Sequence, residues 1–413
     1  MLFDDVYASI LARSSVKGVG LAGMRVLLRR LGNPHQKFKV IHVAGTNGKG
    51  TVCTLLAHAI TTAGFSAGLF ISPHLISPTE RISIDGESIS KQAFSRVIRK
   101  VLSVEDSPLN FFEILTLAAF VYFAQKKVQY VVLETGLGGR KDPTNVCAPL
   151  ICLITSVGLD HTAILGKTIE KIAWEKAGII KKGIPLFCGM LPPVAQQVVC
   201  EEARRQQVPL FMLKKNLQVV SVNWKHKEMS FWNGKARWAL HLLGEKQLQN
   251  AYLVYCVCRF LNIPSLAIKK AFKTVNMPGR FEIITTKNQI FILDGAHNPP
   301  AIKNLISFFQ RSPFYGKAAL LCGFMKDKAY AEMLSLLAPH FSQIIVTCPP
   351  SLRAALPEEY PITSLQKKIH FIPNVEQAFH QASSHKIILC TGSFYLVGWM
   401  RKKLHEDKKI VAK

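Results

Sequence analysis

The sequence predicts an α/β protein with two domains. Short apolar runs rich in β-forming residues alternate with helical patterns, which is typical of parallel sheets with crossover helices. At 413 residues the chain is too long for a single hydrophobic core. Met277-Pro278-Gly279 interrupts the helical pattern, and the strand–helix alternation starts again beyond it. We therefore expect one domain at residues 1–277 and a smaller one at residues 278–413.

The elements of the first domain follow in order along the chain. A strand is expected at 39–43, followed by a glycine-rich loop and a helix from Thr51 to about Ala63 that Gly64 closes. Further expected elements are strands at 131–133 and 151–157, and helices at 168–179, 246–261 and 265–275. Residues 215–240 resemble an antiparallel insertion, with Trp224, Trp232 and Trp238 around the turn signal Asn233-Gly234.

The second domain shows the same alternation on a smaller scale. Strands are expected at 290–293, 318–321, 343–347 and 386–390. We interpret this half as a Rossmann-like α/β domain.

Composition limits the classes of partner. The net charge of +26 is spread along the chain, with only short basic runs, and aromatic residues are not interleaved with them. We therefore expect no nucleic-acid partner. A basic field also suits a protein that handles ATP and acidic small molecules.

The chain shows no signal for export or membrane insertion. No basic region followed by an apolar stretch opens the sequence. The most apolar stretch, Phe111 to Ala124, is short and carries Glu113, so we expect no membrane span. The ten cysteines include no Cys-x-x-Cys pair. These features predict a cytoplasmic protein with reduced thiols, and we expect a monomer because nothing marks an interface.

The strongest local signal is a glycine-rich segment between a predicted strand and helix. Its backbone N–H groups can surround a phosphate near the positive end of a helix. Lys49 can add charge at the β- and γ-phosphates, and the Thr51 hydroxyl can bind Mg²⁺. The spacing departs from the common nucleotide loop, because Gly50 separates Lys49 from Thr51. A glycine-rich turn without a ligand is the alternative. We interpret the first domain as a P-loop ATPase-type domain that binds ATP through Gly45, Thr46, Asn47, Gly48, Lys49, Gly50 and Thr51.

Other candidate residues are ambiguous when taken alone. Glu134 closes an apolar strand, where open α/β sheets place ligand groups, although a structural ion pair is equally compatible. The glycines at 136, 138 and 139 leave room for a hard cation to reach this carboxylate. His161 alone indicates a capping or core histidine, because Mg²⁺ prefers oxygen. Ser72 alone indicates a turn hydroxyl, and Lys176 alone indicates a solvated helical lysine.

A set of ordered blocks resolves these alternatives by resemblance. The loop Ala44 to Thr51 resembles that of the Mur-ligase superfamily and, within it, the folylpolyglutamate synthase family. The further blocks that resemble this family, in the family's order, are 72–75 (SPHL), 80–82 (ERI), 134–140 (ETGLGGR), 160–162 (DHT), 175–179 (EKAGI), 278–282 (PGRFE), 294–299 (DGAHNP), 323 with 327–328, and 392–393.

The resemblance implies metal ligands in the first domain. It makes Glu134 and His161 ligands of Mg²⁺ and places Ser72 near the metal. It suggests that Lys176 is carbamylated, which would turn a cation into a carboxylate-like anion that helps to hold a second Mg²⁺. Two ions are expected, and a monovalent cation such as K⁺ is also compatible with the family.

The resemblance also implies contacts with the nucleotide and the pterin. It assigns Arg280 to the ATP phosphates, Asp294 to the ribose, and His297 to the neighbourhood of the adenine. Asn250 matches another nucleotide-contacting block, although the chain has Lys246 where the family usually has His. Asp142 corresponds to a position near the pterin substrate, and its neighbours Lys141 and Pro143 depart from the family pattern.

The implied reaction joins a carboxylate to an amine at the expense of ATP. The family's acids are dihydropteroate and the γ-glutamyl carboxylate of reduced folates, and its amine is L-glutamate. We expect a bifunctional dihydrofolate synthase and folylpolyglutamate synthase that forms an acyl phosphate, with Lys49, Glu134, His161 and Lys176 as its catalytic residues. Its partners would be these small molecules alone.

Three alternatives stay open at this point. A monofunctional member of the family would carry out one of the two reactions. A peptidoglycan Mur ligase would need an additional N-terminal domain, for which little chain precedes Gly45. A basic nucleic-acid-binding ATPase would use the same phosphate loop as a switch.

Overall fold

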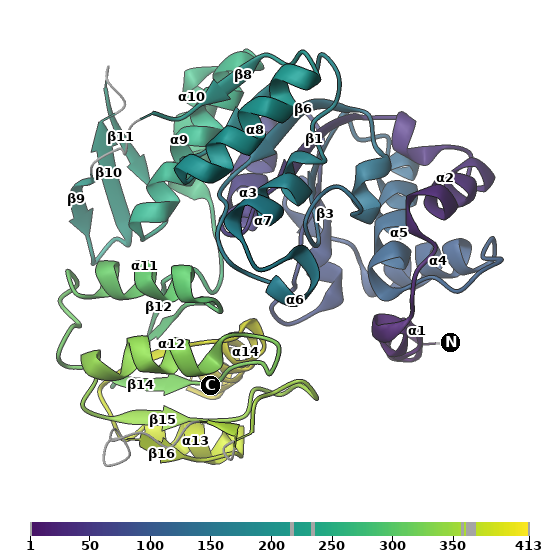
Figure 1. Cartoon of the computed structure of the whole chain (residues 1–413). Coiled ribbons are helices and arrows are strands. Elements are labelled where there is room, and N and C mark those ends of the chain that lie inside the picture. The colour runs from purple at the N-terminus through teal and green to yellow at the C-terminus, as the bar shows by residue number, and fades with distance from the viewer. Residues whose placement is uncertain (1, 215–218, 233–235, 357–358, 361–368, 412–413) are drawn as a thin grey trace. The chain divides into compact units, whose positions relative to one another are not determined.

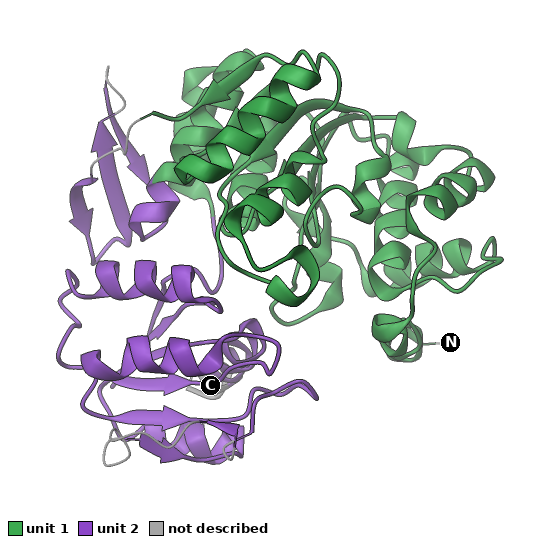
Figure 2. Cartoon of the chain, viewed as in Figure 1, with its two compact units in different colours: residues 1–217, 249–275 green, residues 218–248, 276–413 purple. Residues whose placement is uncertain are grey.

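The computed structural model describes residues 2–214, 219–232, 236–356, 359–360 and 369–411. The chain forms two compact units, one of residues 1–217 and 249–275 and the other of residues 218–248 and 276–413 (Figure 2). Both units contain sheets and helices, and the expected α/β class is confirmed (Figure 1).

The described part of the first unit contains an eight-stranded sheet in the order β4-β3-β2-β5-β1-β6-β7-β8. Neighbours from β2 through β8 are parallel, whereas β3 and β4 form an antiparallel edge. Its strands are β1 (Lys39–Ala44), β2 (Ala67–Phe70), β3 (Ile82–Ile84), β4 (Glu87–Ser88), β5 (Tyr130–Glu134), β6 (Pro149–Ile154), β7 (Leu186–Cys188) and β8 (Leu210–Met212). The central strands are almost wholly buried, as parallel strands between helical layers should be.

Helices accompany this sheet along most of the first unit. They are α1 (Phe3–Leu11), α2 (Gly20–Arg30), α3 (Lys49–Thr62), α4 (Lys91–Leu102), α5 (Phe111–Gln125), α6 (Thr162–Leu165), α7 (Ile169–Ala177), α8 (Pro193–Arg205), α9 (Glu245–Phe260) and α10 (Ser265–Thr274). Short 3₁₀ turns lie at Ala12–Ser15, Pro34–Gln36, Pro78–Arg81, Pro143–Val146 and, in the second unit, Ala338–His340.

The most apolar stretch of the sequence is the buried helix α5. The Asn110 side chain accepts the N–H groups of Phe112 and Glu113 and so caps its start. The Glu113 carboxylate accepts the N–H groups of Val19 and Gly20 at 3.2 and 2.9 Å. This buried acid is therefore a structural tie to an earlier segment. Across the described residues, no helix combines the length and apolar character that a bilayer span requires.

The second unit contains a six-stranded sheet, counted over its described residues, in the order β12-β13-β17-β14-β15-β16. Strand β12 runs antiparallel to β13, and the other neighbours are parallel. The strands are β12 (Glu282–Thr285), β13 (Ile290–Leu293), β14 (Ala319–Cys322), β15 (Ile344–Val346), β16 (Ile369–Phe371) and β17 (Ile387–Thr391). The helices are α11 (Pro299–Phe309), α12 (Tyr330–Leu337), α13 (Val375–Ala382) and α14 (Phe394–Val411).

The expected antiparallel insertion is present, but it groups with the second unit. It consists of β9 (Val219–Asn223), β10 (Glu228–Trp232) and β11 (Arg237–Leu240) in the order β11-β10-β9, while Asn233-Gly234 lies outside the described residues. The Trp224 ring packs against Phe281, Phe308 and Phe314 at centroid distances of 6.2, 5.4 and 6.0 Å.

These contacts explain why the expected division after residue 277 differs from the observed grouping. Lys227 adds a hydrogen bond to the Ile283 carbonyl at 2.5 Å. Trp224 and Lys227 thus make their contacts with residues more than fifty positions further along the chain, which a linear reading cannot reveal. Apart from this insertion, the change from one unit to the other falls at residues 275–276, close to the expected boundary.

Candidate active site

The phosphate loop connects β1 to α3 and is shorter than expected. The helix begins at Lys49 rather than Thr51, with Gly48 as its N-cap residue at φ +86°. A Cβ atom added to Gly48 would lie 2.6 Å from Oδ1 of Asn250. Glycine at 48 therefore allows both the left-handed backbone and the close approach of α9. The structure thus places Asn250, a predicted nucleotide-binding residue, beside the loop.

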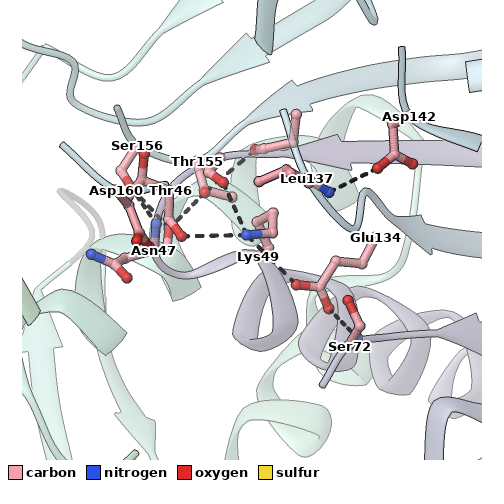
Figure 3. A network of polar contacts seen from close by, with 12 residues as sticks. Thr46, Asn47, Lys49, Ser72, Glu134, Leu137, Asp142, Thr155, Ser156 and Asp160 are labelled. Carbon is pink, nitrogen blue, oxygen red and sulfur yellow. Dashed lines mark hydrogen bonds and ion pairs between the residues drawn. The ribbon is translucent and has the colours of Figure 1, made fainter. Parts of the chain in front are cut away.

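Two hydroxyl residues that were not among the predicted site residues hold this loop from the segment directly after β6. The Thr155 hydroxyl donates to the Asn47 carbonyl at 2.7 Å. The Ser156 hydroxyl accepts the Asn47 N–H at 3.0 Å and donates to the Asn47 carbonyl at 2.9 Å (Figure 3). The Thr46 N–H donates to the Ser156 carbonyl at 2.9 Å. The available signal was their place directly after an apolar strand, at the carboxyl edge of the sheet.

The Lys49 ammonium lies between the loop and a buried carboxylate. Its Nζ donates to the carbonyls of Gly45 and Thr46 at 2.9 and 3.3 Å. The same Nζ is 3.9 Å from Oε1 of Glu134 (Figure 3). Thr51 follows in the first turn of α3 and is 2% exposed. A cation and a helix N-terminus are thus directed at one location, which is an arrangement suited to phosphate.

Glu134 ends β5, beside Val43 of β1, and is 3% exposed. Its Oε2 atom accepts the Ser72 N–H at 3.0 Å (Figure 3). The predicted residues Lys49, Ser72 and Glu134 therefore come together at the carboxyl edge of the sheet. A buried carboxylate is costly unless cations or hydrogen-bond donors surround it, so this oxygen pair is suited to a hard cation.

The glycines after Glu134 also allow close packing of neighbouring helices. A Cβ atom at Gly136 would lie 2.5 Å from the Phe112 ring, and one at Gly139 would lie 3.0 Å from the Glu175 carbonyl. Side chains at these positions would therefore collide with α5 and α7. They are small because α5 and α7 pack directly against this segment.

Asp142 is buried beneath the same segment. Its Oδ2 atom accepts the Leu137 N–H at 2.8 Å, and Oδ1 accepts the N–H and hydroxyl of Thr144 at 3.0 and 2.5 Å. Because the Thr144 hydroxyl donates to Asp142, His42 donates its Nε2–H to that hydroxyl at 2.8 Å. Burial raises the pKa of Asp142, and these hydrogen bonds oppose the shift. The Asp142 carboxylate thus holds the backbone of the segment that follows Glu134.

Lys176 is buried in α7, contrary to its simple reading as a solvated lysine. Its residue is 3% exposed. Burial, followed by the charge of Lys49, lowers the pKa of Lys176 to about 7, while Asp160, Asp142 and Glu175 oppose the shift. With this pKa about half of the Lys176 amine is neutral near pH 7, whereas a solvated lysine amine is almost wholly charged.

Arg140 caps the end of α7 that carries Lys176. Its backbone N–H donates to the Glu175 carbonyl at 2.8 Å, and its guanidinium donates to the Trp174 carbonyl at 3.1 Å. The guanidinium also lies over the Trp174 ring, 3.8 Å from the centroid. Since helix ends leave carbonyls without partners, Arg140 stabilises α7 from outside the helix.

His161 lies at the start of α6 with φ +48°. Its N–H donates to Oδ1 of Asp160 at 2.9 Å, and its Nε2 is 3.9 Å from the same oxygen. In the portion of the chain that the structure describes, no three His, Cys, Asp or Glu side chains gather as a metal-binding group. If His161 and Glu134 both bind a metal ion, no third His, Cys, Asp or Glu side chain among the described residues gathers with them, so the remaining ligands would come from hydroxyl groups, the substrate or water.

Two of the predicted nucleotide residues of the second unit contact the Phe394 ring. The Arg280 guanidinium lies 4.5 Å from the centroid of the Phe394 ring, and the His297 ring lies 5.2 Å from it. Asp294 accepts the N–H groups of Phe281 and Ala296, both at 2.9 Å. Burial raises the pKa of Asp294, while Arg280 opposes the shift. Phe394 was not among the predicted site residues, although the preceding Gly392-Ser393 was part of a matching block.

Comparison with known proteins identifies the family. The family model described as Mur ligase middle domain matches residues 43–258, and the model described as Mur ligase, glutamate ligase domain matches residues 279–394. The chain belongs to the Mur ligase family. It is 34% identical to the dihydrofolate synthase/folylpolyglutamate synthase of Bacillus subtilis strain 168, over 93% of this chain and 95% of that protein.

Solved structures of related enzymes match the fold over nearly the whole chain. Folylpolyglutamate synthase of Mycobacterium tuberculosis, complexed with ADP and AMPPCP, has a TM-score of 0.88 at 27% identity and covers 97% of this chain and 98% of its own. E. coli FolC, in complex with DHPP and ADP, has a TM-score of 0.87 at 28% identity and covers 99% of both chains. This Mur ligase family member is an ATP-dependent ligase of the folylpolyglutamate synthase and dihydrofolate synthase group.

Proposed function

We propose that the chain adds L-glutamate to dihydropteroate and to the γ-carboxylate of reduced folates, and that it is thus bifunctional. The observation that carries the proposal is the Lys49 ammonium held between the phosphate loop and the buried Glu134 carboxylate, 3.9 Å away. The full-length likeness to a dihydrofolate synthase/folylpolyglutamate synthase supports the choice of substrates.

The chemistry has to overcome the low reactivity of a carboxylate. Transfer of the γ-phosphoryl group of ATP gives an acyl phosphate, which the glutamate amine attacks while phosphate leaves. Backbone N–H groups of the loop and Lys49 neutralise the charge that moves during the transfer. Thr155 and Ser156 keep Asn47 in place, so the loop is preorganised before ATP arrives.

Mg²⁺ fits the oxygen donors of this site. Glu134 and Thr51 would hold the ion through their buried oxygens, and the Ser72 N–H fixes one Glu134 oxygen. Mg²⁺ commonly binds one or two carboxylates together with substrate phosphates and water, so a larger cluster of acids is not required. When bound, the ion supplies charge neutralisation at the phosphates, and His161 would add a nitrogen ligand beside Asp160. A second Mg²⁺, and K⁺ as a further cation, belong to the same proposal.

Lys176 would act as a carbamate. The neutral amine adds to CO₂ and its nitrogen loses a proton, and the lowered pKa of Lys176 provides a large neutral fraction near neutral pH. The product is a carboxylate-like anion that would assist in holding the second Mg²⁺. Asp142 would serve the pterin acid indirectly, because its oxygens already fix the segment that follows Glu134.

The remaining assignments concern the nucleotide and the setting of the enzyme. Arg280 would bind the phosphates of ATP, Asp294 the ribose, and His297 the adenine, with Asn250 contacting the nucleotide beside the loop. We further propose a cytoplasmic monomer whose partners are small molecules alone. The ten free cysteines support a reducing compartment.

The decisive experiment supplies purified protein with ATP, Mg²⁺ and L-glutamate, plus either dihydropteroate or tetrahydrofolate, and follows ADP release and product mass. We expect both acids to gain glutamate. Turnover with one acid alone would support the monofunctional alternative. Absence of turnover with both acids, together with stimulation of ATP hydrolysis by RNA, would contradict the folate proposal and support the nucleic-acid-binding ATPase.

A further inference from the structure

The turn that carries Arg280 has an unfavourable backbone conformation. Gly279 has φ +70°, and the non-glycine residue Phe281 has φ +47°. A left-handed conformation at a bulky aromatic residue persists only where surrounding contacts impose it. The position of Arg280, between these two residues, therefore depends on what holds the turn.

Hydrogen bonds from three directions hold it. The Gly279 carbonyl accepts the Gly295 N–H at 2.9 Å, and the Phe281 N–H donates to Asp294 at 2.9 Å. The Gly279 N–H donates to Oε2 of Glu282 at 2.8 Å. The last of these contacts makes the Glu282 carboxylate a support for the turn.

Glu282 is in turn held by Arg401 of α14. Nε of Arg401 lies 3.1 and 3.2 Å from the two oxygens of Glu282, and the side chains are 20% and 18% exposed. A largely buried ion pair with hydrogen bonds fixes geometry better than an exposed one does. The contact therefore ties the Arg280 turn to α14.

The same helix supports Arg280 at a second point. Phe394, whose ring lies under the Arg280 guanidinium, is seven residues before Arg401 and so on the same face of α14, two turns away. One end of this support fixes the guanidinium and the other fixes the backbone of the turn. Such an arrangement preorganises a cationic side chain for an anionic ligand.

We propose that Glu282 and Arg401 are positioning residues that set Arg280 for the phosphates of ATP. The inference rests on the proposed role of Arg280 at the nucleotide. Neither residue would touch ATP, and both would act through the Gly279–Phe281 turn.

The chain offers a matched control on the same helix. Lys403 makes an ion pair with Glu376 at 3.0 Å, with side-chain exposures of 26% and 50%. This pair joins α14 to α13, so Lys403→Gln removes a cation and an ion pair of α14 outside the Arg280 turn. Arg401→Lys is the conservative variant, because it keeps the charge and one donor.

The experiment measures steady-state kinetics for ATP and for L-glutamate with the full chain. We expect Arg401→Gln and Glu282→Gln each to lower kcat/KM for ATP by about tenfold. KM for L-glutamate should change by less than about twofold in both variants. Arg401→Lys should recover part of the loss, Lys403→Gln should match the wild type, and thermal melting should show that each variant is folded.

The Arg280→Ala background separates positioning from general damage. If Arg401 acts through Arg280, then adding Arg401→Gln to Arg280→Ala should lower kcat/KM for ATP by less than about twofold further. An equal loss in both backgrounds, or wild-type kinetics in Arg401→Gln, would overturn the proposal. Unchanged ATP kinetics in Arg280→Ala itself would instead overturn the assignment of Arg280, and the positioning role with it.

Discussion

Lys176 lies near the end of α7, where burial lowers the pKa of its amine. In water a lysine amine is charged at neutral pH and does not add to CO₂. Burial and the nearby Lys49 charge lower its pKa to about 7. Between about pH 7 and pH 10.5 the unfolded chain thus binds one proton at Lys176 that the folded chain does not. The contribution of Lys176 to the free energy of unfolding therefore rises with pH across that window, and it is least favourable below about pH 7.

A test of the carbamate follows from this shift. Lys176→Ala should lower kcat by about a hundredfold or more, and small carboxylates such as acetate should restore part of it by replacing the missing anion. Lys171→Ala, which changes an exposed lysine of the same helix, should retain wild-type activity. Intact-mass and crystallographic measurements that found a bare amine beside bound metal would contradict the carbamate.

Lys49 is the other residue whose role depends on a single charge. Its ammonium contacts the loop carbonyls and lies near Glu134, so its loss removes charge neutralisation at the phosphates. We expect Lys49→Ala to lower kcat for both ligation reactions by about a hundredfold to a thousandfold. Far-ultraviolet circular dichroism should match the wild type. Retained turnover at saturating ATP would show that the loop does not hold the reacting phosphates through Lys49.

Among the elements, the small sheet β9–β11 has the clearest energetic consequence. In the chain it lies between β8 and α9, yet Trp224 packs on aromatic residues from beyond residue 280. Its strands also leave part of one face exposed, so the sheet by itself buries few apolar side chains. We therefore expect the contacts of Trp224 with Phe281, Phe308 and Phe314 to stabilise the insertion.

Removing the Trp224 ring should weaken that packing. Because truncating this partly buried aromatic removes its ring contacts and some buried apolar area, Trp224→Ala should destabilise the second unit by about 2 kcal/mol. Trp232, which is 54% exposed, provides the control, and Trp232→Ala should change the unfolding midpoint little. Urea unfolding followed by circular dichroism measures both. Equal midpoints for the two variants would contradict the proposed role of Trp224.

At the scale of the whole molecule, the net charge of +26 acts on substrates before they reach the site. ATP and folates carry negative charge, and a positive protein attracts them over distances that salt shortens. The charge thus bears on the capture of substrates rather than on the fold.

The expected result is a KM that depends on salt. Raising NaCl from about 20 to about 200 mM should increase KM for ATP by about threefold or more, with a smaller change in kcat. A folate triglutamate should respond more steeply than a monoglutamate, because it carries more carboxylates. Kinetics at both salt concentrations provide the measurement, and a KM insensitive to salt would show that the basic field does not attract the substrates.

The sequence by itself determined the α/β class, several strands of each unit, and the positions of the phosphate loop and the matching blocks. These features depend on local periodicity and on residues close together in the chain, such as the glycines before Lys49. Most expected strands agree with the structure within a few residues for the same reason.

The tertiary structure alone decided which distant groups meet. Thr155 and Ser156 hold a loop more than a hundred residues earlier, Phe394 lies under Arg280, and Arg401 reaches Glu282 from 119 positions away. The burial of Lys176 likewise comes from packing that no local pattern contains. Hydrogen bonds, ion pairs and desolvation act through space, so the sequence could name the reacting groups, whereas only the folded chain set their partners and protonation.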